Sequence, residues 1–574
     1  MHAEPNPEGN YPNPNALTAD SLSFTKKYMI LCACWFAPEK PKMTTFLKPT
    51  MMALDKIYRQ GIVVKVSPTE TATVRGLLMM AVMDLPAKAK ALVMKQFNGM
   101  YGCNECGDSG KNPDGSNNSL HRIWPYTADM TMRSHRSIIE NVRETLSRSN
   151  PGNAVMGIMG ASVFLRYHAL DMSNSFPVDW MHAVLLGVAK TMLELWFSPQ
   201  SYGEPFNISK SIPDLNKQLL ALKVPDCISH RPRSITEKHH WKASEFRSWL
   251  LYYSMPLLHD VLPAEYVAHY FLLVSAIWTL ASDDITTADL TTAGLRLDAF
   301  CKSFEELYGE RRQTMNIHKL RHLQMYVEMY GPVWTTSLFG FESMNGHLKR
   351  MVHGTRFIVT QITFTKSMSW GLQRVAAAME NIHERKGVVK LAQRLTSVAE
   401  RPNSTRLCSG LYLLGNPVDR HVHEEHLEAV RTAVGHVDNT IKYPYFHRIE
   451  LNGQAIYSRE YGREKTRNSR TVEFEVDGAV HFGEVVTFCN IGTTHLAVLQ
   501  DLLPIATPLI DCSVVQNLTI KVALQRPLSE KVFEVRRGDT YRAVPITSLR
   551  RKCVFMSTGV RTYIGRFPNV VEKD

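Results

Sequence analysis

The sequence predicts a mixed α/β protein with a long helical middle and a β-rich carboxyl-terminal part. A continuous apolar run at residues 29–37 (MILCACWFA) is typical of a buried strand. From about residue 179 to residue 397, apolar side chains recur at helical spacing. After about residue 443, short alternating and β-branched stretches replace them. These three observations together predict the fold class.

Length, charge and cysteine content limit the class of protein. A chain of 574 residues exceeds what one hydrophobic core supports, so roughly two to four domains are expected. The formal net charge of +12 favours a polyanionic partner, most simply nucleic acid. The ten cysteines are mostly scattered, which argues for a reducing compartment rather than a disulfide framework. The polar amino terminus lacks a signal-peptide core, and the longest apolar run, near residues 270–281, is too short to span a bilayer.

The amino-terminal part begins with a polar segment. Residues 1–22 are rich in Pro and Asn and are expected to be disordered. After the apolar run, the pattern predicts a helix over residues 43–60 and a short strand at residues 62–66. Residues 71–84 have mixed spacing, and their type stays open.

The helical middle is predicted from repeated apolar positions at helical spacing. Asp179 is a plausible N-cap for the first of these helices, because its side chain can accept hydrogen bonds from the first turn. The expected helices cover residues 179–196, 244–260, 264–282, 287–308, 317–329, 342–353 and 360–397.

The character of the chain changes at about residue 400. Residues 399–442 are polar and rich in His and charge, and are expected to form a linker or a loose helix. Residues 443–574 are expected to form a small β-domain of barrel or sandwich type. They carry no clustered carboxylates and no phosphate-binding loop, which indicates an accessory role. Strands are expected at residues 471–476, 485–488, 496–499, 518–522, 553–556 and 563–565.

Residues that bind metals form a nested pattern along the chain. Two cysteines and two histidines have the donor atoms and spacings of a tetrahedral zinc site: Cys103, Cys106, His318 and His322. Outside them lie Asp84 and Glu342, whose hard oxygen donors suit magnesium or manganese. A zinc ion bound by all four inner residues would join distant segments and help bring the two carboxylates near each other.

Each of these residues also has a purely structural interpretation. His318 and His322 can be a neutral pair packed on a helix face. The two outer carboxylates can be a turn cap and a surface helix residue. A zinc site can also use His121 or His135, which are nearer to the cysteines in sequence, in place of one late histidine.

Several stretches resemble cut-and-paste DNA transposases of the CACTA/EnSpm type, in the form carried by animal and algal transposons. The resemblance spans nearly the whole chain. The matching stretches are KPKMTTFLKP (40–49), RGLLMMAVMDLPAKAK (75–90), FNGMYGCNEC (97–106), FPVDWMHAVLLGVAK (176–190), LPAEYVAHYFLLVSAIWTLASDDIT (262–286), NIHKLRHL (316–323), FGFESMNGHLKRMVHGT (339–355) and RKCVFMSTGVRTYIGRFPNVVEKD (551–574).

This resemblance implies an incomplete ribonuclease-H-like core that carries a DDE triad of catalytic carboxylates. The core would be formed by residues 23–102 and 323–398, and residues 103–322 would be a large helical insertion with the zinc site. Asp84 would be the second Asp of the triad, and Glu342 would be its Glu. Three carboxylates hold the two metal ions that carry out in-line displacement at phosphorus, in DNA strand cleavage and transfer.

The first Asp of the triad departs from the family pattern. In the family it lies in an Asp-Gly motif well upstream of the apolar strand, whereas here only Asp20 precedes that strand, in a polar segment. We therefore expect an amino-terminally truncated transposase that is inactive in this form. The alternative is a non-catalytic, zinc-stabilised remnant that binds DNA or protein. An upstream Asp-Gly strand would favour the first interpretation.

Two further groups of residues are candidates for function. Asp179-x2-His182 matches another motif of the family, or is an N-cap Asp with a first-turn His. Lys349 and Arg350 follow Glu342 on one helix and can approach DNA phosphates, or can form a solvated basic face. The resemblance further implies structural zinc, catalytic magnesium or manganese, transposon-end DNA as partner and a nuclear location. The resemblance does not decide whether the protein forms a homo-oligomer.

Overall fold

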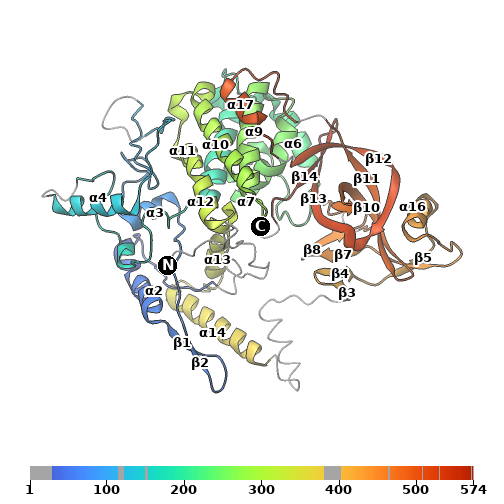
Figure 1. Cartoon of the computed structure of the whole chain (residues 1–574), viewed down its shortest axis with the longest axis horizontal. Coiled ribbons are helices and arrows are strands. Elements are labelled where there is room, and N and C mark those ends of the chain that lie inside the picture. Colours follow the sequence, from blue (N-terminus) through green and yellow to red (C-terminus); the bar gives the residue numbers. More distant parts are fainter. Residues whose placement is uncertain are drawn as a thin grey trace, which may run out of the picture. The chain divides into compact units, whose positions relative to one another are not determined.

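The chain folds into two compact units, each assembled from two separate segments (Figure 1). Unit 1 comprises Met1–Gly187 and Cys301–Ala399, and unit 2 comprises Val188–Phe300 and Glu400–Asp574. The structure is a computed structural model, and it describes residues 29–113, 122–148, 153–379, 403–462, 466–506, 509–528, 531–569 and 572. The segment expected to be disordered, with Asp20, and the alternative ligand His121 lie outside the described residues.

Unit 1 is mainly helical. The only sheet in its described residues is an antiparallel pair, β1 (Ile62–Lys65) with β2 (Thr71–Val74). The helices before the boundary are α1 (Met43–Phe46), α2 (Lys48–Gln60), α3 (Leu85–Leu92), α4 (His135–Ser147), η3 (Val163–Arg166) and η4 (Met181–Ala189), which runs into unit 2. Those of the second segment are the end of α10 (Thr287–Tyr308), η9 (Glu310–Arg312), α11 (Met315–Lys319), η10 (Leu320–His322), α12 (Leu323–Tyr330), η11 (Val333–Thr336), α13 (Phe339–Lys349) and α14 (Ile358–Met379).

The described part of unit 1 does not contain a ribonuclease-H-like sheet. The strand predicted at residues 29–37 is not formed, because the extended segment there pairs with no other strand. Ile30, Trp35 and Phe36 are 76%, 53% and 65% exposed, so the run is not buried either. Apolar composition favours a strand only where neighbouring strands complete its hydrogen bonds and cover its faces. That prediction was wrong for the described residues.

The core of unit 1 joins the helices that come before and after the cysteine pair. Met51 of α2, Leu92 of α3, Ile138 of α4 and Phe164 of η3 are buried in one cluster with Phe176. This packing holds the end of α3 against the segment that leads into η4. Both elements carry residues of the candidate site.

Unit 2 begins with helices that are largely buried. They are α5 (Lys190–Phe197), η5 (Pro199–Ser201), η6 (Ser209–Ser211), α6 (Ile212–Ala221), η7 (Ile235–His240), α7 (Ala243–Ser248), η8 (Trp249–Tyr253), α8 (Ser254–Leu258), α9 (Ala264–Leu280) and most of α10. The helices predicted over residues 264–282 and 287–308 thus correspond to α9 and α10. Within the described ranges, no helix combines the length and apolarity needed to cross a membrane.

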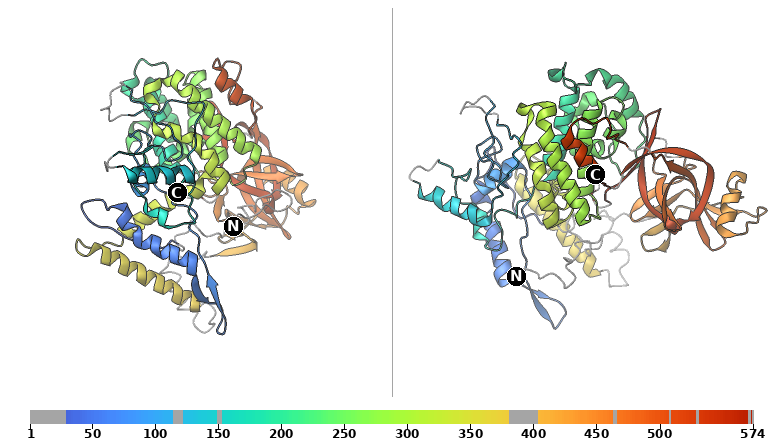
Figure 2. Two further views of the ribbon diagram at one scale, coloured as in Figure 1. Left: turned by 60° about the vertical axis from the view of Figure 1, so that its left-hand side comes forward. Right: turned by 45° about the horizontal axis from the view of Figure 1, so that its top comes forward.

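The β-rich part of unit 2 contains a closed barrel of six antiparallel strands (Figure 2, right). The order around the barrel is β11-β12-β14-β13-β9-β10, and β10 pairs back to β11. Closure removes the free edges of these strands, which would otherwise invite pairing with another chain. The strands are β9 (Thr471–Val476), β10 (Ala479–Ile491), β11 (Thr494–Pro504), β12 (Val532–Pro545), β13 (Leu549–Ser557) and β14 (Thr562–Arg566).

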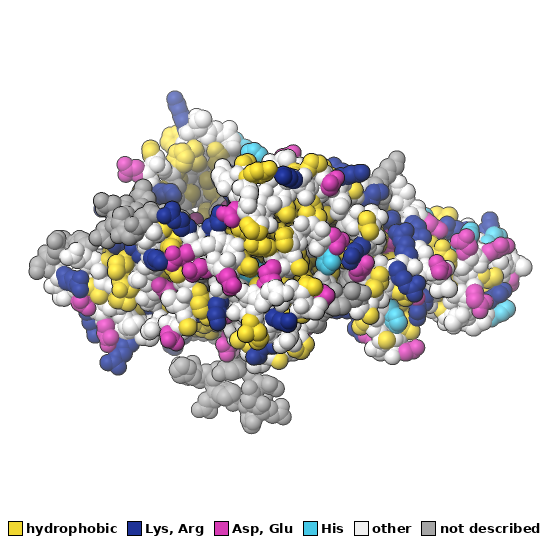
Figure 3. Space-filling model, turned by 90° about the horizontal axis from the view of Figure 1, so that it is seen from above, with side chains coloured by type: hydrophobic (Ala, Val, Ile, Leu, Met, Phe, Trp, Pro, Cys, Tyr) yellow, Lys and Arg dark blue, Asp and Glu magenta, His cyan; other side chains and the backbone are white. Residues whose placement is uncertain are grey.

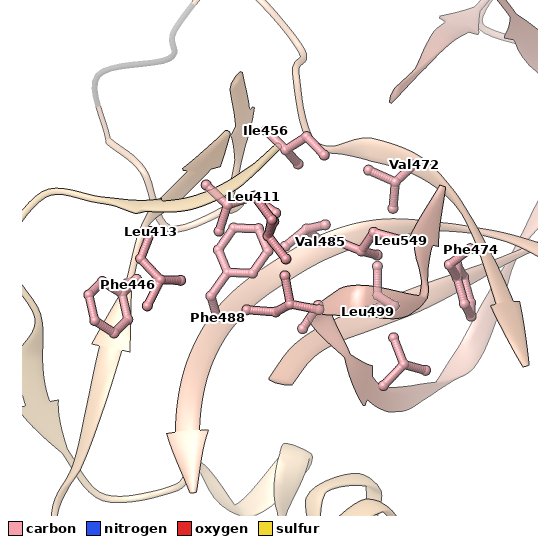
Figure 4. Close-up of a cluster of buried hydrophobic side chains, with 14 residues drawn as sticks. Leu411, Leu413, Phe446, Ile456, Val472, Phe474, Val485, Phe488, Leu499 and Leu549 are labelled. Atoms are coloured by element: carbon pink, nitrogen blue, oxygen red, sulfur yellow. The ribbon is translucent and has the colours of Figure 1, made fainter. Parts of the chain in front are cut away.

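A second sheet packs on this barrel and shares its core. It has the order β3-β4-β7-β8, while β6 and β5 extend the barrel sheet from β10. Leu411 and Ile456 of the second sheet meet Phe488 and Leu499 of the barrel in one buried cluster (Figure 4). The additional strands are β3 (Ser404–Cys408), β4 (Leu411–Leu414), β5 (Val418–Arg420), β6 (Tyr443–Phe446), β7 (Arg448–Leu451) and β8 (Gln454–Tyr457).

The β-rich character predicted for the carboxyl-terminal part is confirmed, with differences in detail. The described part of the stretch expected as a linker contains β3, β4, β5 and the helix α16 (Glu424–Val434). Residues 518–522 lie in a helix, α17 (Leu518–Gln525), and the strand predicted there was wrong. Asn517 caps this helix by accepting a hydrogen bond from the amide of Ile520. Short apolar runs do not by themselves distinguish helix from strand.

Candidate metal centre and carboxylate site

The cysteine pair lies in a buried loop that follows α3. Cys103 and Cys106 are both inaccessible to solvent. The Nε of Arg133 donates to the carbonyls of Cys103 and Cys106, at 3.0 and 2.9 Å. Its Nη2 donates to the carbonyls of Tyr101 and Met156. One guanidinium group thus fixes the turn that points both thiols the same way.

The histidine pair comes from the second segment of unit 1. His318 lies on α11 and His322 ends η10, so one helical turn separates them and both rings lie on the same side. Both are buried. The ring of Trp124 packs against that of His318, with centroids 5.2 Å apart. The predicted pairing of early cysteines with late histidines is therefore present in the fold.

The four side chains have the spacing that a tetrahedral zinc ion requires. The Sγ of Cys103 lies 3.5 Å from the Nε2 of His322, and the Sγ of Cys106 lies 3.3 Å from the Nε2 of His318. The two Nε2 atoms are 3.3 Å apart. Zinc bonds of about 2.3 Å to sulfur and about 2.05 Å to nitrogen, at tetrahedral angles, separate S from N by about 3.6 Å and N from N by about 3.3 Å. The cluster can therefore hold a metal ion such as zinc.

The protonation states of the cluster also suit a metal. Burial lowers the pKa of His322 to about 4, which keeps the imidazole neutral and able to donate a lone pair. Burial alone would raise the pKa of Cys103. The hydrogen bond with Cys106 and the positive charge of Lys319 nevertheless bring it well below its ordinary value. The Nδ1 of His318 lies 3.9 Å from Asp108, the kind of outer carboxylate that orients metal-binding histidines.

A buried charge network surrounds the metal centre. Lys88, Glu105 and Lys319 are all nearly inaccessible to solvent. Glu105 lies between the two cysteines in sequence, and its carboxylate forms an ion pair with Lys319 and lies 3.7 Å from the Nζ of Lys88. Lys319 also donates to the Sγ of Cys103 at 3.4 Å and to Asn104 at 2.9 Å. Two ammonium groups are thus balanced by Glu105 and by a thiolate on Cys103.

The same network reaches toward the carboxylates. Lys88 lies one turn into α3, whose N-cap is Asp84. Its Nζ donates to the carbonyls of Phe176 and Pro177, at 2.9 and 2.7 Å. These carbonyls come directly before the segment that carries Asp179. Lys88 therefore ties the start of α3 to the start of η4.

Asp84 caps a helix in the structure. Its Oδ1 accepts a hydrogen bond from the amide of Ala87 at 2.8 Å, which caps α3. The side chain remains partly exposed, so its other oxygen can still meet a ligand. The turn-cap interpretation and a metal-binding role are compatible.

Asp179 is a buried positioning residue. One of its oxygens accepts from the amides of Met181 and Leu338, at 3.2 and 3.0 Å. The other accepts from the amide of His182 at 3.1 Å and faces its Nδ1 at 2.5 Å. Four contacts occupy the lone pairs of the carboxylate, so Asp179 has no capacity left for a metal ion. Because Leu338 precedes α13, Asp179 joins the starts of η4 and α13.

Glu342 lies in the first turn of α13, and its side chain is exposed. His182 connects it electrostatically to Asp84. The hydrogen bond with Asp179 is the main cause that raises the pKa of His182, and the negative charges of Asp84 and Glu342 raise it further. The two carboxylates predicted as metal ligands therefore both lie within electrostatic reach of one imidazole, although 258 positions separate them in sequence.

The remaining candidates take more ordinary positions. Lys349 and Arg350 are exposed at the end of α13, with no side-chain partner among the described residues. His135 is not part of the cysteine cluster, because its Nδ1 accepts a hydrogen bond from the amide of Met172 in a different part of unit 1. The alternative ligand set with His135 was therefore wrong.

The charged residues of the network were missed from the sequence. Lys88, Glu105 and Lys319 look like ordinary surface residues, since charged side chains are rarely buried. The available signal was position: Glu105 lies between two cysteines, and Lys319 follows a ligand histidine.

Comparisons with known proteins give no function for this chain, so a functional assignment has to be argued from its residues. No protein-family model matches this chain, and no curated protein matches it at a significant level.

Proposed function

We propose that this chain is a transposase-derived protein, related to enzymes that cut and transfer DNA strands with metal ions held by carboxylates. The observation that carries the proposal is that the charges of Asp84 and Glu342 both act on His182, in the unit that holds the buried Cys2His2 cluster. In this proposal zinc occupies the Cys2His2 centre and holds the two segments of unit 1 together. Asp84 and Glu342 then bind magnesium or manganese.

The roles of the nearby residues follow from their contacts. Asp179 orients His182 and raises its pKa, which favours the protonated imidazole, whose Nε2–H can donate to a phosphate oxygen. The exposed Lys349 and Arg350 lie on the helix that carries Glu342 and can bind the DNA backbone. A DNA partner implies a nuclear location.

The proposal includes loss of catalysis. Two-metal phosphoryl transfer uses three carboxylates. Among the three that act on His182, Asp179 is already saturated by hydrogen bonds, which leaves Asp84 and Glu342. We therefore propose that this form binds divalent metal weakly and does not cleave DNA.

Binding of manganese to the zinc-loaded protein, followed by electron paramagnetic resonance, tests the proposal. Asp84→Asn and Glu342→Gln should each weaken binding by at least about tenfold, because each removes one of two charged ligands. Glu140→Gln, which changes an exposed glutamate of α4, is the matched control and should leave binding unchanged.

A second candidate function is a zinc-stabilised remnant that binds DNA or protein without catalysis. The saturation of Asp179 favours it, since a two-carboxylate site is a poor catalyst. On the face shown in Figure 3, Lys and Arg are interspersed with Asp and Glu, which suits weak rather than specific DNA binding. Equal manganese binding by wild type and both carboxylate variants would favour this second function.

A further inference from the structure

A pocket in unit 2 shares no residue with the metal centre and is unexplained by the proposed function. It is formed by the helices α8, α9 and α10 together with the segment that carries α17, which packs against α9 (Figure 1). Its volume is about 190 Å³. Its wall is mostly apolar and includes Leu251, Met255, Phe271, Val274 and Trp278. For comparison, an apolar cavity of about 150 Å³ in another protein holds benzene.

One charged side chain in this wall has no charged partner among the residues that the structure describes. Arg296 is 4% exposed. Its Nη1 donates to the Oγ of Ser275 at 2.6 Å, and its Nη2 donates to the carbonyl of Arg526 at 2.8 Å. Its Nε has no hydrogen-bond partner among the described residues. The guanidinium also lies 5.7 Å from the centre of the Phe271 ring. Each of these contacts of the buried cation is with a neutral group.

Burying a cation of this kind lowers the stability of the folded state. Taking a charge out of water costs several kcal/mol unless an opposite charge and further hydrogen bonds replace the lost hydration. Burial lowers the pKa of Arg296 to about 10, so the group is still charged at neutral pH. An anion in the pocket would supply both the missing charge and an acceptor for Nε.

A second cation lies in the same wall. The Nζ of Lys531 lies 4.3 Å from the centre of the Trp278 ring. Burial lowers the pKa of Lys531 to about 8, while the charge of Asp289 acts in the opposite direction. The pocket therefore combines an apolar wall with two positive groups, which is the arrangement of a ligand site with a few polar anchors.

We propose that this pocket binds a small organic anion, with one carboxylate or similar oxyanion on Arg296 and an apolar body of about one aromatic ring against Phe271 and Trp278. The size of the pocket and the apolar wall oppose a nucleic-acid phosphate, which carries no apolar body of this kind. The inference is independent of the metal centre and the carboxylates.

Calorimetric titration of the full chain with phenylacetate tests the proposal, with phenylacetamide as the uncharged isostere. Phenylacetate should bind at least about tenfold more tightly, because a charge-assisted hydrogen bond is worth more than a neutral one. Arg296→Met should remove this preference for the acid. Arg431→Met, which changes an exposed arginine of α16, is the matched control and should keep it.

Several results would overturn the inference. They are equal binding of phenylacetate and phenylacetamide, unchanged binding by Arg296→Met, and inorganic phosphate binding as tightly as phenylacetate. Circular dichroism establishes that Arg296→Met is folded. If it is not folded, Arg296→Lys replaces it, because lysine keeps the positive charge with fewer hydrogen-bond donors. This variant should weaken the binding of phenylacetate more than the binding of phenylacetamide. Equal weakening of the binding of both ligands would count against the inference.

Discussion

Glu105→Gln tests whether the buried charge network holds the metal centre together. The substitution keeps the shape of the side chain and removes its charge. It leaves the ammonium groups of Lys88 and Lys319 buried without the carboxylate that faces both of them. Removing one partner of a buried ion pair costs about 3–5 kcal/mol. We expect unit 1 to lose at least about 3 kcal/mol of stability.

Zinc release from the zinc-loaded protein during a urea titration measures this loss, because all four candidate ligands lie in unit 1. With a denaturant slope of about 2–3 kcal/mol per M, the midpoint should fall by about 1 M or more. Glu140→Gln is the control. Glu140 pairs with Arg136 on the surface of α4, where the side chains are 55% and 89% exposed. Such pairs contribute less than about 1 kcal/mol.

The comparison of Glu105→Gln with Glu140→Gln tests whether the buried charge network stabilises unit 1. A midpoint for Glu105→Gln that moves no further than that for Glu140→Gln would refute the assignment of a buried, charged network. Adding Lys319→Met to Glu105→Gln should recover part of the lost stability, because it removes one of the two ammonium groups that faced the Glu105 carboxylate.

Three further predictions address other parts of the molecule. Cys103→Ser should lower zinc content below one ion per chain, measured by elemental analysis, because the thiolate is one of four ligands. Burial lowers the pKa of His269 to about 4, so the folded state binds fewer protons than the unfolded state, and unit 2 should lose about 3 kcal/mol as pH falls from about 6.5 to about 4. In His269→Phe, the free energy of unfolding should change less between these two pH values, as measured by urea unfolding at each pH. Asp179→Asn should lower the pKa of His182 in a nuclear magnetic resonance titration, because the main cause of its raised value is removed, and an unchanged value would contradict the contact.

The sequence was sufficient to predict the cluster that can hold a metal ion. Cysteine and histidine at these spacings have few other uses as a set, so donor chemistry identified Cys103, Cys106, His318 and His322 before any fold was known. The long apolar helix α9 was predicted for a similar reason, because its pattern extends over many residues.

Other features depend on contacts that no local pattern reveals. Strand β12 carries Arg536, Arg537 and Arg542, and these charges hide the alternation that marks a strand. In the fold, Arg542 pairs with Asp501 on the adjacent strand β11, and Arg537 pairs with the buried Glu484 on β10, the next strand beyond β11. Such cross-strand pairs are known only once the sheet order is known. The same holds for Lys88 and Glu105 around the metal centre.

The interleaving of the two units along the chain has a consequence for synthesis at the ribosome. The first segment of unit 1 and the first segment of unit 2 are both made before either unit can be completed. Cys103 and Cys106 emerge more than 200 residues before His318, so the nascent chain carries two unliganded thiols over that interval. At about 5–20 residues per second this lasts roughly 10–40 s. Contacts between such distant segments also form slowly, so we expect the newborn chain to expose its apolar surface and its thiols for longer than a chain whose units are contiguous.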